Sequence, residues 1–322
     1  MLLYSYNLVY YTHAVKFYII IPEGFNVFES QTERLKQSGE VRIIPHKGKL
    51  ADLEELKKDP DEKILNIDHD AIEGDLDVEA FEEIHNVKAV SVTSSTFDWI
   101  KPKELKKKGI IVCNSPGATI GPAAEYALCM AIEGLRKTAL HMKNNMQVDW
   151  DAAPMSLDGK TVGIIGLGRM GMHIAEKGMA LGAKIAYWSK NTRNDKYEYK
   201  ELDQLFKDAD VIIPAVAESE ETKMIITKQH IDSMKKTAII VGLNRIKFIL
   251  DEEFILDKVA KNEIGGYAFE GDNAKELSNY KGNVWAMPAI AWFTDQSLKN
   301  LIDISISNML AVAQGKPQNV VN

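Results

Sequence analysis

The chain has 322 residues, about twice the length of a usual single domain, so two domains are expected. Hydrophobic residues make up 45% and charged residues 26%, which is typical of a globular protein and excludes a disordered or membrane-spanning one. A net charge of −7 disfavours binding to nucleic acid or to an anionic membrane, although a local basic site for one phosphate is compatible with it. We therefore expect small molecules as partners, and neither nucleic acid nor membrane.

The two cysteines, Cys113 and Cys129, form neither a CxxC motif nor part of a histidine cluster. This pattern predicts no zinc or other metal site and no disulfide framework, and it favours the reducing cytoplasm. The first twenty residues are apolar but lack a basic start and a cleavage site, and they include charged Lys16, so we expect no signal or anchor. We predict the first buried strand over 15–21.

Short apolar runs alternate with helix-length amphipathic stretches in two successive series. The first series contains FYIII, VRII, ILNI, VKAVSV and IIVCN. The second begins near Ser156 and contains TVGIIG, KIAYW, DVIIPAV, AIIVG, GYAF and NVWAM. Strands alternating with helices imply βαβ units and mostly parallel sheets. The sequence therefore predicts an α/β protein with two doubly wound, Rossmann- or flavodoxin-like domains.

Two apolar helical patterns lie outside these series. Residues 120–145 carry apolar side chains at helical spacing and predict one long helix that packs in a core or at a dimer interface. A final amphipathic helix after Thr294 needs a surface to pack on. If it returns to the first domain, that domain is discontinuous in sequence.

A glycine-rich loop follows the first strand of the second series. It reads Gly166-Leu167-Gly168-Arg169-Met170-Gly171 and precedes a helix and the strand KIAYW. In a dinucleotide site the first glycine permits a tight turn, the second lets the backbone approach the pyrophosphate, and the third lets the helix pack on the strand. A plain strand-to-helix turn is the alternative, but strand, loop, helix and strand together favour a dinucleotide site.

The segment after KIAYW bears on the choice of cofactor. An acidic residue there would bind the 2′-hydroxyl of NAD, but this chain has Ser189, Lys190 and Arg193 instead. One hydroxyl and two cations predict a site for the 2′-phosphate of NADP, with NAD possible. The alternative is a solvated basic turn.

These residues and several other segments resemble the D-isomer-specific 2-hydroxyacid dehydrogenase family, which includes phosphoglycerate dehydrogenases and glyoxylate/hydroxypyruvate reductases. The segments are VKAVSVTSSTFDWI, GIIVCNSPGATIGPAAEYAL, GKTVGIIGLGRMG, LFKDADVIIPAVAESEETKMI, MKKTAIIVGLNR and MPAIAWFTDQS. The resemblance implies a cofactor domain over 117–293 and a substrate domain over 1–116 plus 294–322. It also implies an active site between the domains and a homodimer formed through the long helix.

The resemblance also assigns roles to individual residues. Arg245 matches the arginine that holds the substrate carboxylate, a task suited to its bidentate guanidinium. Ser95 and Thr96 match the backbone segment that cradles the same carboxylate. Cofactor binding is implied for Gly166, Gly168, Arg169, Met170, Gly171, Ser189, Lys190, Arg193, Ala215, Ala217, Thr222, Leu243, Arg245, Glu270 and Ala291.

The match breaks at the residue that transfers the proton. The family has a histidine where this chain has Ala289, and a methyl group can neither donate nor accept a proton. The partner glutamate is matched by Lys275, with Glu276 beside it. Further departures are Ala215 for a histidine and Glu270 for an aspartate. Lys275 is a candidate substitute acid if it is partly desolvated, and a solvent-exposed loop lysine is the alternative.

Three functional hypotheses remain open. The first is hydride transfer between NADP(H) and a small 2-oxo or 2-hydroxy acid, with Arg245 as carboxylate anchor and an unconventional or water-derived proton. The second is a nucleotide-binding protein without turnover that acts as a sensor or interaction partner. The third is an enzyme for another substrate that needs no histidine acid. None of the seven histidines falls in a matching position.

Overall fold

The computed structural model describes residues 15–25, 29–147, 150, 153–243 and 246–322. The chain forms two compact units, one made of residues up to Ala118 together with Asp295–Asn322, the other of Thr119–Thr294. The chain passes from one unit to the other at 118/119 and 294/295, within two residues of the boundaries expected from the sequence.

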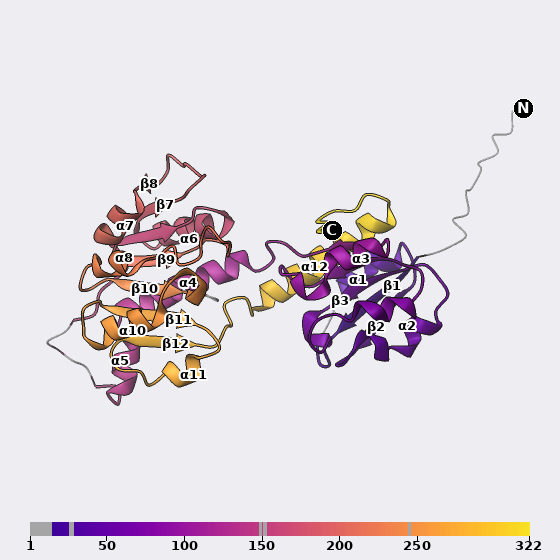
Figure 1. Ribbon diagram of the computed structural model, residues 1–322, viewed down its shortest axis with the longest axis horizontal. Helices are drawn as coiled ribbons and strands as arrows, with labels where there is room; N and C mark the ends of the chain where they lie inside the picture. Colours follow the sequence, from indigo (N-terminus) through magenta and orange to yellow (C-terminus); the bar gives the residue numbers. More distant parts are fainter. Residues whose placement is uncertain (1–14, 26–28, 148–149, 151–152, 244–245) are drawn as a thin grey trace, which may run out of the picture. The chain divides into compact units, whose positions relative to one another are not determined.

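The first unit is built on a parallel five-stranded sheet with the order β2-β1-β3-β4-β5, of which β1, β2 and β3 are labelled in Figure 1. This is the flavodoxin-like order expected of a doubly wound sheet. Its elements are β1 (Lys16–Ile21), α1 (Glu29–Lys36), β2 (Val41–Pro45), α2 (Glu54–Lys58), β3 (Lys63–Ile67), β4 (Val87–Val92), α3 (Pro102–Lys107), β5 (Ile111–Cys113) and α12 (Asp295–Ala313), with 3₁₀ turns at Leu50–Asp52, His69–Ala71, Val78–Glu82 and Asp98–Ile100.

Strand β1 shows why both faces of this sheet are covered. Successive side chains of a strand point to opposite faces, so an uninterrupted apolar run must be buried on both. Phe17, Ile19 and Ile21 pack in one cluster with residues of α1 and α12. Tyr18 and Ile20 pack in the other cluster with residues of α2 and α3.

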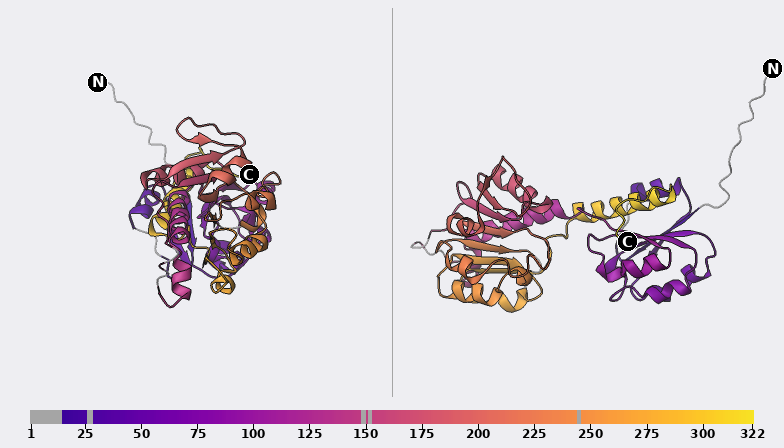
Figure 2. Two further views of the ribbon diagram at one scale, coloured as in Figure 1. Left: turned by 90° about the vertical axis from the view of Figure 1, so that its left-hand side faces the viewer. Right: turned by 45° about the horizontal axis from the view of Figure 1, so that its top comes forward.

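Helix α12 belongs to the first unit although it is last in the sequence. Figures 1 and 2 show it in yellow beside α1. Gln31 of α1 donates from Nε2 to Asp303 Oδ1 at 2.8 Å. Buried Asn308 donates from Nδ2 to the carbonyl oxygen of Asn114 at 2.8 Å, which satisfies part of its polar side chain in the core. The final apolar helix thus returns to the first domain.

The second unit holds a parallel seven-stranded sheet with the order β12-β11-β10-β9-β6-β7-β8. Counted from β6, this is the order of a Rossmann fold with one extra strand. Its elements are α4 (Ile120–Leu135), α5 (Thr138–Lys143), β6 (Thr161–Ile165), α6 (Arg169–Ala180), β7 (Lys184–Trp188), β8 (Glu198–Tyr199), α7 (Leu202–Asp208), β9 (Val211–Pro214), α8 (Lys228–Asp232), β10 (Ile239–Gly242), α9 (Ile246–Ile249), α10 (Glu252–Ala260), β11 (Gly266–Glu270), α11 (Ala274–Leu277) and β12 (Val284–Met287).

One predicted element is corrected. The single helix expected over 120–145 is two helices, α4 and α5, because Lys137 between them adopts a left-handed conformation with φ of 55°. A helix cannot continue through such a residue. The long apolar pattern did not reveal this break, because both helices keep an apolar face.

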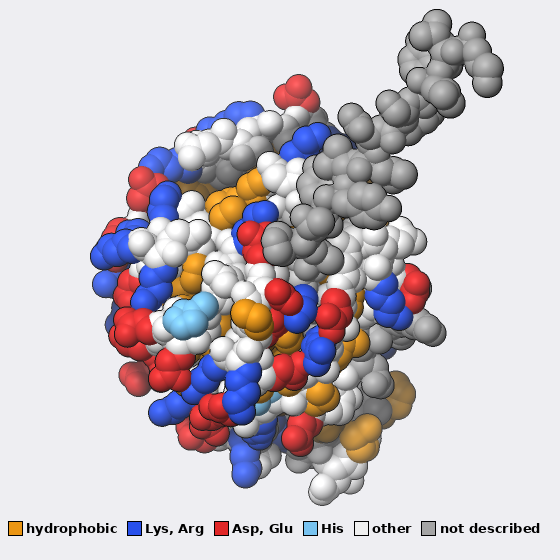
Figure 3. Space-filling model, turned by 90° about the vertical axis from the view of Figure 1, so that its right-hand side faces the viewer, with side chains coloured by type: hydrophobic (Ala, Val, Ile, Leu, Met, Phe, Trp, Pro, Cys, Tyr) orange, Lys and Arg blue, Asp and Glu red, His pale blue; other side chains and the backbone are white. Residues whose placement is uncertain are grey.

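The surface agrees with the charge composition. On the face shown in Figure 3, Lys and Arg side chains are interspersed with Asp and Glu side chains. In the part of the chain that the structure describes, no helix has both the length and the apolar character to cross a bilayer.

Candidate functional site

The candidate cofactor site lies at one edge of the seven-stranded sheet. Strand β6 lies between β9 and β7, and all three run parallel, so their carboxyl ends meet at the same edge. The segments that leave this edge begin at Gly166, Ser189 and Ala215. Ligands of doubly wound sheets bind where the chain order reverses, which here is at β6. The three segments therefore surround the expected dinucleotide position.

The glycine-rich loop has the geometry that a pyrophosphate requires. Gly166 has φ of +96°, and a Cβ there would lie 2.6 Å from Val216 Cγ1. A Cβ on Gly171 would lie 2.1 Å from the carbonyl oxygen of Gly166, so only glycine lets α6 pack this closely. Gly168 caps α6 and has no atom within 4 Å of its Cβ position, which leaves open space at the helix N-terminus. A dinucleotide fits this cradle because the helix dipole and backbone N–H groups favour a phosphate there.

The segment after β7 is held by local hydrogen bonds. Ser189 is buried, and its carbonyl oxygen accepts a hydrogen bond from Arg193 at 2.7 Å. The guanidinium of Arg193 lies 3.8 Å above the ring of Tyr199, a cation–π contact that orients an exposed side chain. The structure therefore gives this cation a defined position beside the end of β7.

The other flank of the loop is the segment after β9. Thr222 Oγ1 donates to the carbonyl oxygen of Ala217 at 2.7 Å and accepts from the N–H of Ser219 at 2.9 Å, which closes a tight turn. From this turn Glu221 reaches Lys190, with 2.8 Å between Oε2 and Nζ. The two segments on either side of β6 are thus joined by an ion pair.

Comparison with known proteins agrees with this arrangement. Residues 128–291 match the model of the family described as D-isomer specific 2-hydroxyacid dehydrogenase, NAD binding domain. The hydroxypyruvate reductase of Blautia hydrogenotrophica is 30% identical over 264 residues, which cover 76% of this chain and 81% of that protein. The glyoxylate reductase of Pyrococcus furiosus is 26% identical over 323 residues, covering 94% and 93%.

The family match covers half of the chain and includes the glycine cradle. The chain belongs to the D-isomer specific 2-hydroxyacid dehydrogenase family. A solved member from Lactobacillus delbrueckii ssp. bulgaricus, in its NAD complexed form, has the same fold, with a TM-score of 0.78, 21% identity and coverage of 96% of this chain and 100% of that one. The resemblance found in the sequence is confirmed, and the chain is an NAD(P)-dependent oxidoreductase of the 2-hydroxyacid type.

The structure describes only some of the positions to which the sequence resemblance assigns catalysis. Arg245 lies outside the described residues. Leu243 before it is half-buried, directly after β10. Ala289 is half-buried two residues after the end of β12, and its methyl group leaves this position without a titratable side chain. The sequence-based prediction for Arg245 therefore stays a prediction.

Glu270 ties the end of β11 to the segment that contains Ala289. Its side chain is buried, and Oε2 accepts the N–H of Ala291 at 2.8 Å. The charge of Glu270 also acts on Tyr126 of α4. Burial raises the pKa of this phenol to about 12, and the negative charge of Glu270 adds to the rise. Glu270 thus positions the backbone of the segment in which the sequence resemblance places the family histidine.

The substitutes considered for the histidine lie on α11. Lys275 and Glu276 are both exposed. The idea of Lys275 as acid required an ammonium held away from water. Its exposed side chain does not meet this requirement, which leaves the solvent-exposed lysine as the better interpretation.

The expected carboxylate cradle lies in the first unit, at the carboxyl end of β4. Ser95 and Thr96 are exposed there. Asn114 Nδ2 donates to the carbonyl oxygen of Ser95 at 2.8 Å, and Trp99 Nε1 donates to that of Thr96 at 3.3 Å. Ser94 Oγ accepts the N–H of Thr96 at 3.1 Å. These bonds fix the segment while its exposed surface stays free for a ligand.

The remaining predicted cofactor residues border the same edge of the second unit. Arg169 is exposed at the start of α6, whereas Met170 and Ala215 are half-buried. Glu221 and Tyr199 were missed by sequence reasoning. Glu221 lies within the acidic run ESEET, but no sequence signal pairs it with Lys190, and β8, which carries Tyr199, is only two residues long.

Proposed function

We propose that the protein is an NADP-preferring reductase of a small 2-oxo acid, with the corresponding 2-hydroxy acid as product. The observation that carries this proposal is the segment after β7. Ser189, Lys190 and Arg193 stand where NAD-binding members have a carboxylate, and that carboxylate would repel a 2′-phosphate. The anchored guanidinium of Arg193 supports phosphate recognition.

The chain's own residues have distinct tasks in this proposal. The bound nicotinamide supplies the hydride. Arg245 holds the substrate carboxylate, and the backbone segment around Ser95 and Thr96 completes its binding. Glu270 keeps the segment at Ala291 in place through its hydrogen bond. The positioned groups lower the barrier chiefly by orientation, because hydride transfer requires a fixed approach to the carbonyl carbon.

The first experiment is a titration of the purified protein with NADPH and, separately, with NADH, followed by nicotinamide fluorescence. Glyoxylate, hydroxypyruvate and pyruvate are then added while absorbance at the nicotinamide band reports oxidation. We expect tighter binding of NADPH than of NADH, and oxidation with at least one of the three acids. Equal binding of both cofactors would refute the NADP preference.

Ala289 favours a second candidate, a nucleotide-binding protein without turnover. Loss of a positioned acid typically lowers a rate by about 10² to 10⁴. Under this second candidate NADPH binds in the same titration, but none of the 2-oxo acids is reduced. Activity toward a different carbonyl substrate would instead support an enzyme that needs no histidine acid.

We further propose that the protein is a cytoplasmic homodimer that associates through the region of α4 and α5. Met142, Met146 and Trp150 follow α4 in this region with 55%, 72% and 88% of their surface exposed. Three exposed large apolar side chains within nine residues of the chain favour a protein interface here. The sequence contains only two cysteines, Cys113 and Cys129, and this low number supports a reducing compartment. Light scattering on the purified protein tests the dimer.

A further inference from the structure

One histidine lies beside the segment expected to cradle the substrate carboxylate. His69 begins the 3₁₀ turn at the carboxyl end of β3, and β3 is the neighbour of β4, which leads into Ser95 and Thr96. The preceding residue, Asp68, accepts a hydrogen bond from Thr93 Oγ1 at 2.5 Å. The turn that carries His69 is thereby tied to the base of the carboxylate segment.

A second contact brings the imidazole itself close to that segment. The ring of His69 lies edge-on to the ring of Trp99, with 4.9 Å between centroids and 78° between planes. Trp99 Nε1 donates in turn to the carbonyl oxygen of Thr96 at 3.3 Å. His69 and Thr96 therefore share one neighbour, and both lie at the edge where doubly wound sheets bind ligands.

The imidazole is both accessible and oriented. Its side chain is 54% exposed, so a substrate can reach it. Nδ1 lies 3.5 Å from Asp70 Oδ1, at the long end of hydrogen-bond distance. A carboxylate on this side can accept a hydrogen bond from Nδ1, and this leaves Nε2 as the nitrogen that can face a ligand. The charged groups beside it are Asp70 and, next to it in the chain, Asp68, whose pKa is raised by burial.

We propose that His69 is the catalytic acid that replaces the histidine absent at Ala289. This proposal rests on the proposed 2-oxo acid reductase. As the carbonyl carbon gains the hydride, the electron pair of the carbonyl bond moves to its oxygen. That oxygen takes a proton from Nε2 of the His69 imidazolium. The products are the 2-hydroxy acid and a neutral imidazole, which is protonated again by water.

Three other described histidines are placed less well for this task. His85 precedes β4 and so lies at the opposite end of that strand from Ser95. His230 is stacked on Phe206 in the second unit and takes part in the cap of α8. His46 lies at the carboxyl edge of the first sheet, but its Nε2 is within 3.0 Å of the carbonyl oxygen of Lys49. Of these four histidines, only His69 is both next to the cradle and open at Nε2.

The test compares His69→Gln with His85→Gln in the full-length protein loaded with NADPH. His85 is an exposed histidine of the same unit and serves as the matched control. We expect kcat with the best 2-oxo acid to fall about 10²- to 10⁴-fold in H69Q, with unchanged NADPH affinity, and to stay the same in H85Q. Thermal denaturation of both variants checks that the fold is kept.

Two further readouts separate proton donation from a structural role. Reduction by the native protein falls as pH rises through the pKa of the donor, and this fall is absent in H69Q. Added imidazole restores part of the rate to H69A. The native protein loaded with oxidised cofactor is also titrated with pH by proton NMR, and the Cε1–H signal of His69 is assigned by its absence in H69Q. We expect the midpoint of this titration to move to higher pH when oxamate binds, because the carboxylate and carbonyl of oxamate favour the imidazolium.

Failures of the two proposals are distinguishable. If the native protein reduces no 2-oxo acid, the proposed function fails and the role of His69 fails with it. If the native protein is active, but H69Q keeps its rate and pH profile, His69 alone is overturned. An unchanged His69 midpoint in the presence of bound oxamate overturns it as well, without any use of activity.

Discussion

Lys190 and Glu221 form an ion pair of 2.8 Å that spans the two segments flanking the dinucleotide loop. Both side chains are largely exposed, at 60% and 70%, so the pair adds little to stability in water. The position of this ion pair matters more than its strength. The ammonium that would meet a 2′-phosphate already has a carboxylate partner, and a phosphate must compete with Glu221 for it.

We therefore expect Glu221→Gln to tighten NADPH binding by about two- to fivefold, which is the range of an exposed pair. NADH has no 2′-phosphate, so its affinity stays unchanged. Glu220→Gln removes a neighbouring exposed charge and serves as the control. Fluorescence titration at low and high salt measures both, and the effect shrinks at high salt because exposed charges are screened. A gain of equal size for NADH would show that Glu221 does not compete with the phosphate.

The glycine loop offers a test that separates folding from binding. A Cβ on Gly168 meets no protein atom within 4 Å, so Gly168→Ala lowers the melting temperature only slightly, through weaker capping of α6. The methyl group would occupy the space of the pyrophosphate, and we expect NADPH affinity to fall about tenfold or more.

Gly171→Ala is the matched contrast. Its Cβ would lie 2.1 Å from the carbonyl oxygen of Gly166, so the protein loses stability as well as binding. Calorimetry gives the melting temperature and titration the affinity. Full NADPH affinity in the Gly168 variant would place the pyrophosphate elsewhere.

The fold could be predicted from the sequence because its signals are local. Uninterrupted apolar runs such as β1 must be buried on both faces, and the glycines of the dinucleotide loop each meet a geometric need that the structure displays. The break at Lys137 was missed because a left-handed lysine is not a sequence signal.

The site was less predictable because its contacts join segments far apart in the chain. The pairing of Lys190 with Glu221 and the contact of His69 with Trp99 each depend on how neighbouring strands end. Family comparison draws attention to Ala289 and away from His69, because it tests histidines only at matching positions. The structure supplies the neighbourhood that this comparison lacks.

The alanine at 289 can be used to test the proton source. If His69 already donates the proton, Ala289→His in the native background changes kcat less than about threefold. If no residue of the native protein donates it, the same substitution raises kcat about 10²- to 10⁴-fold. In the H69Q background the same substitution raises kcat at least about tenfold, because a histidine then occupies the position it has in the family.

Ala289→Leu controls for side-chain size, since leucine carries no proton. Stopped-flow oxidation of NADPH measures the native protein and the four variants under the same conditions. If the double variant H69Q/A289H stays at the rate of H69Q, position 289 does not face the reacting carbonyl.

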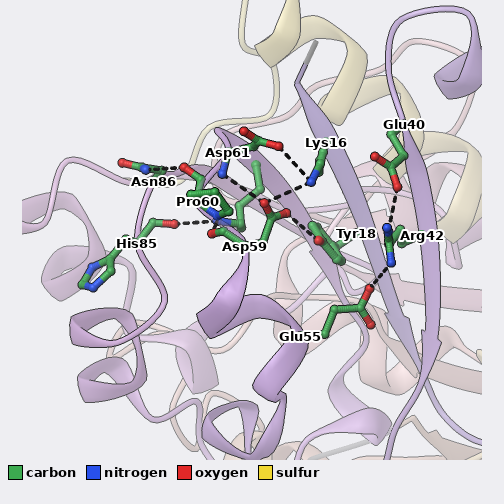
Figure 4. A network of polar contacts seen from close by, with 11 residues as sticks. Lys16, Tyr18, Glu40, Arg42, Glu55, Asp59, Pro60, Asp61, His85 and Asn86 are labelled. Carbon is green, nitrogen blue, oxygen red and sulfur yellow. Dashed lines mark hydrogen bonds and ion pairs between the residues drawn. The ribbon is translucent and has the colours of Figure 1, made fainter. Parts of the chain in front are cut away.

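A buried polar network supports the first unit away from the cradle (Figure 4). Asp59 accepts hydrogen bonds from Tyr18 at 2.6 Å and Lys16 at 3.1 Å, and a further one from the N–H of Asp61 at 3.0 Å. Burial acts to raise the pKa of Asp59, but these hydrogen bonds outweigh it and hold the pKa below its ordinary value. The ionised carboxylate is therefore the form that stabilises the fold.

We expect Asp59→Asn to lower the free energy of unfolding by about 1–3 kcal/mol at neutral pH, because it weakens charge-assisted hydrogen bonds in a buried place. Asp61→Asn is the control: its side chain is 50% exposed and pairs with the same Lys16, so the loss stays below about 1 kcal/mol. Urea denaturation measures both. Equal losses would mean that burial of Asp59 has no energetic consequence.

The stability that Asp59 contributes should decrease at low pH. The pKa of Asp59 is lower in the folded than in the unfolded state, so its contribution is complete above the unfolded value of about 3.9. It is lost as pH falls through the folded pKa, because the proton then binds both states alike. The difference between the native protein and Asp59→Asn should therefore be constant from neutral pH down to about 5 and narrow below about 4. A difference that persists in strong acid would assign the effect to packing and not to charge.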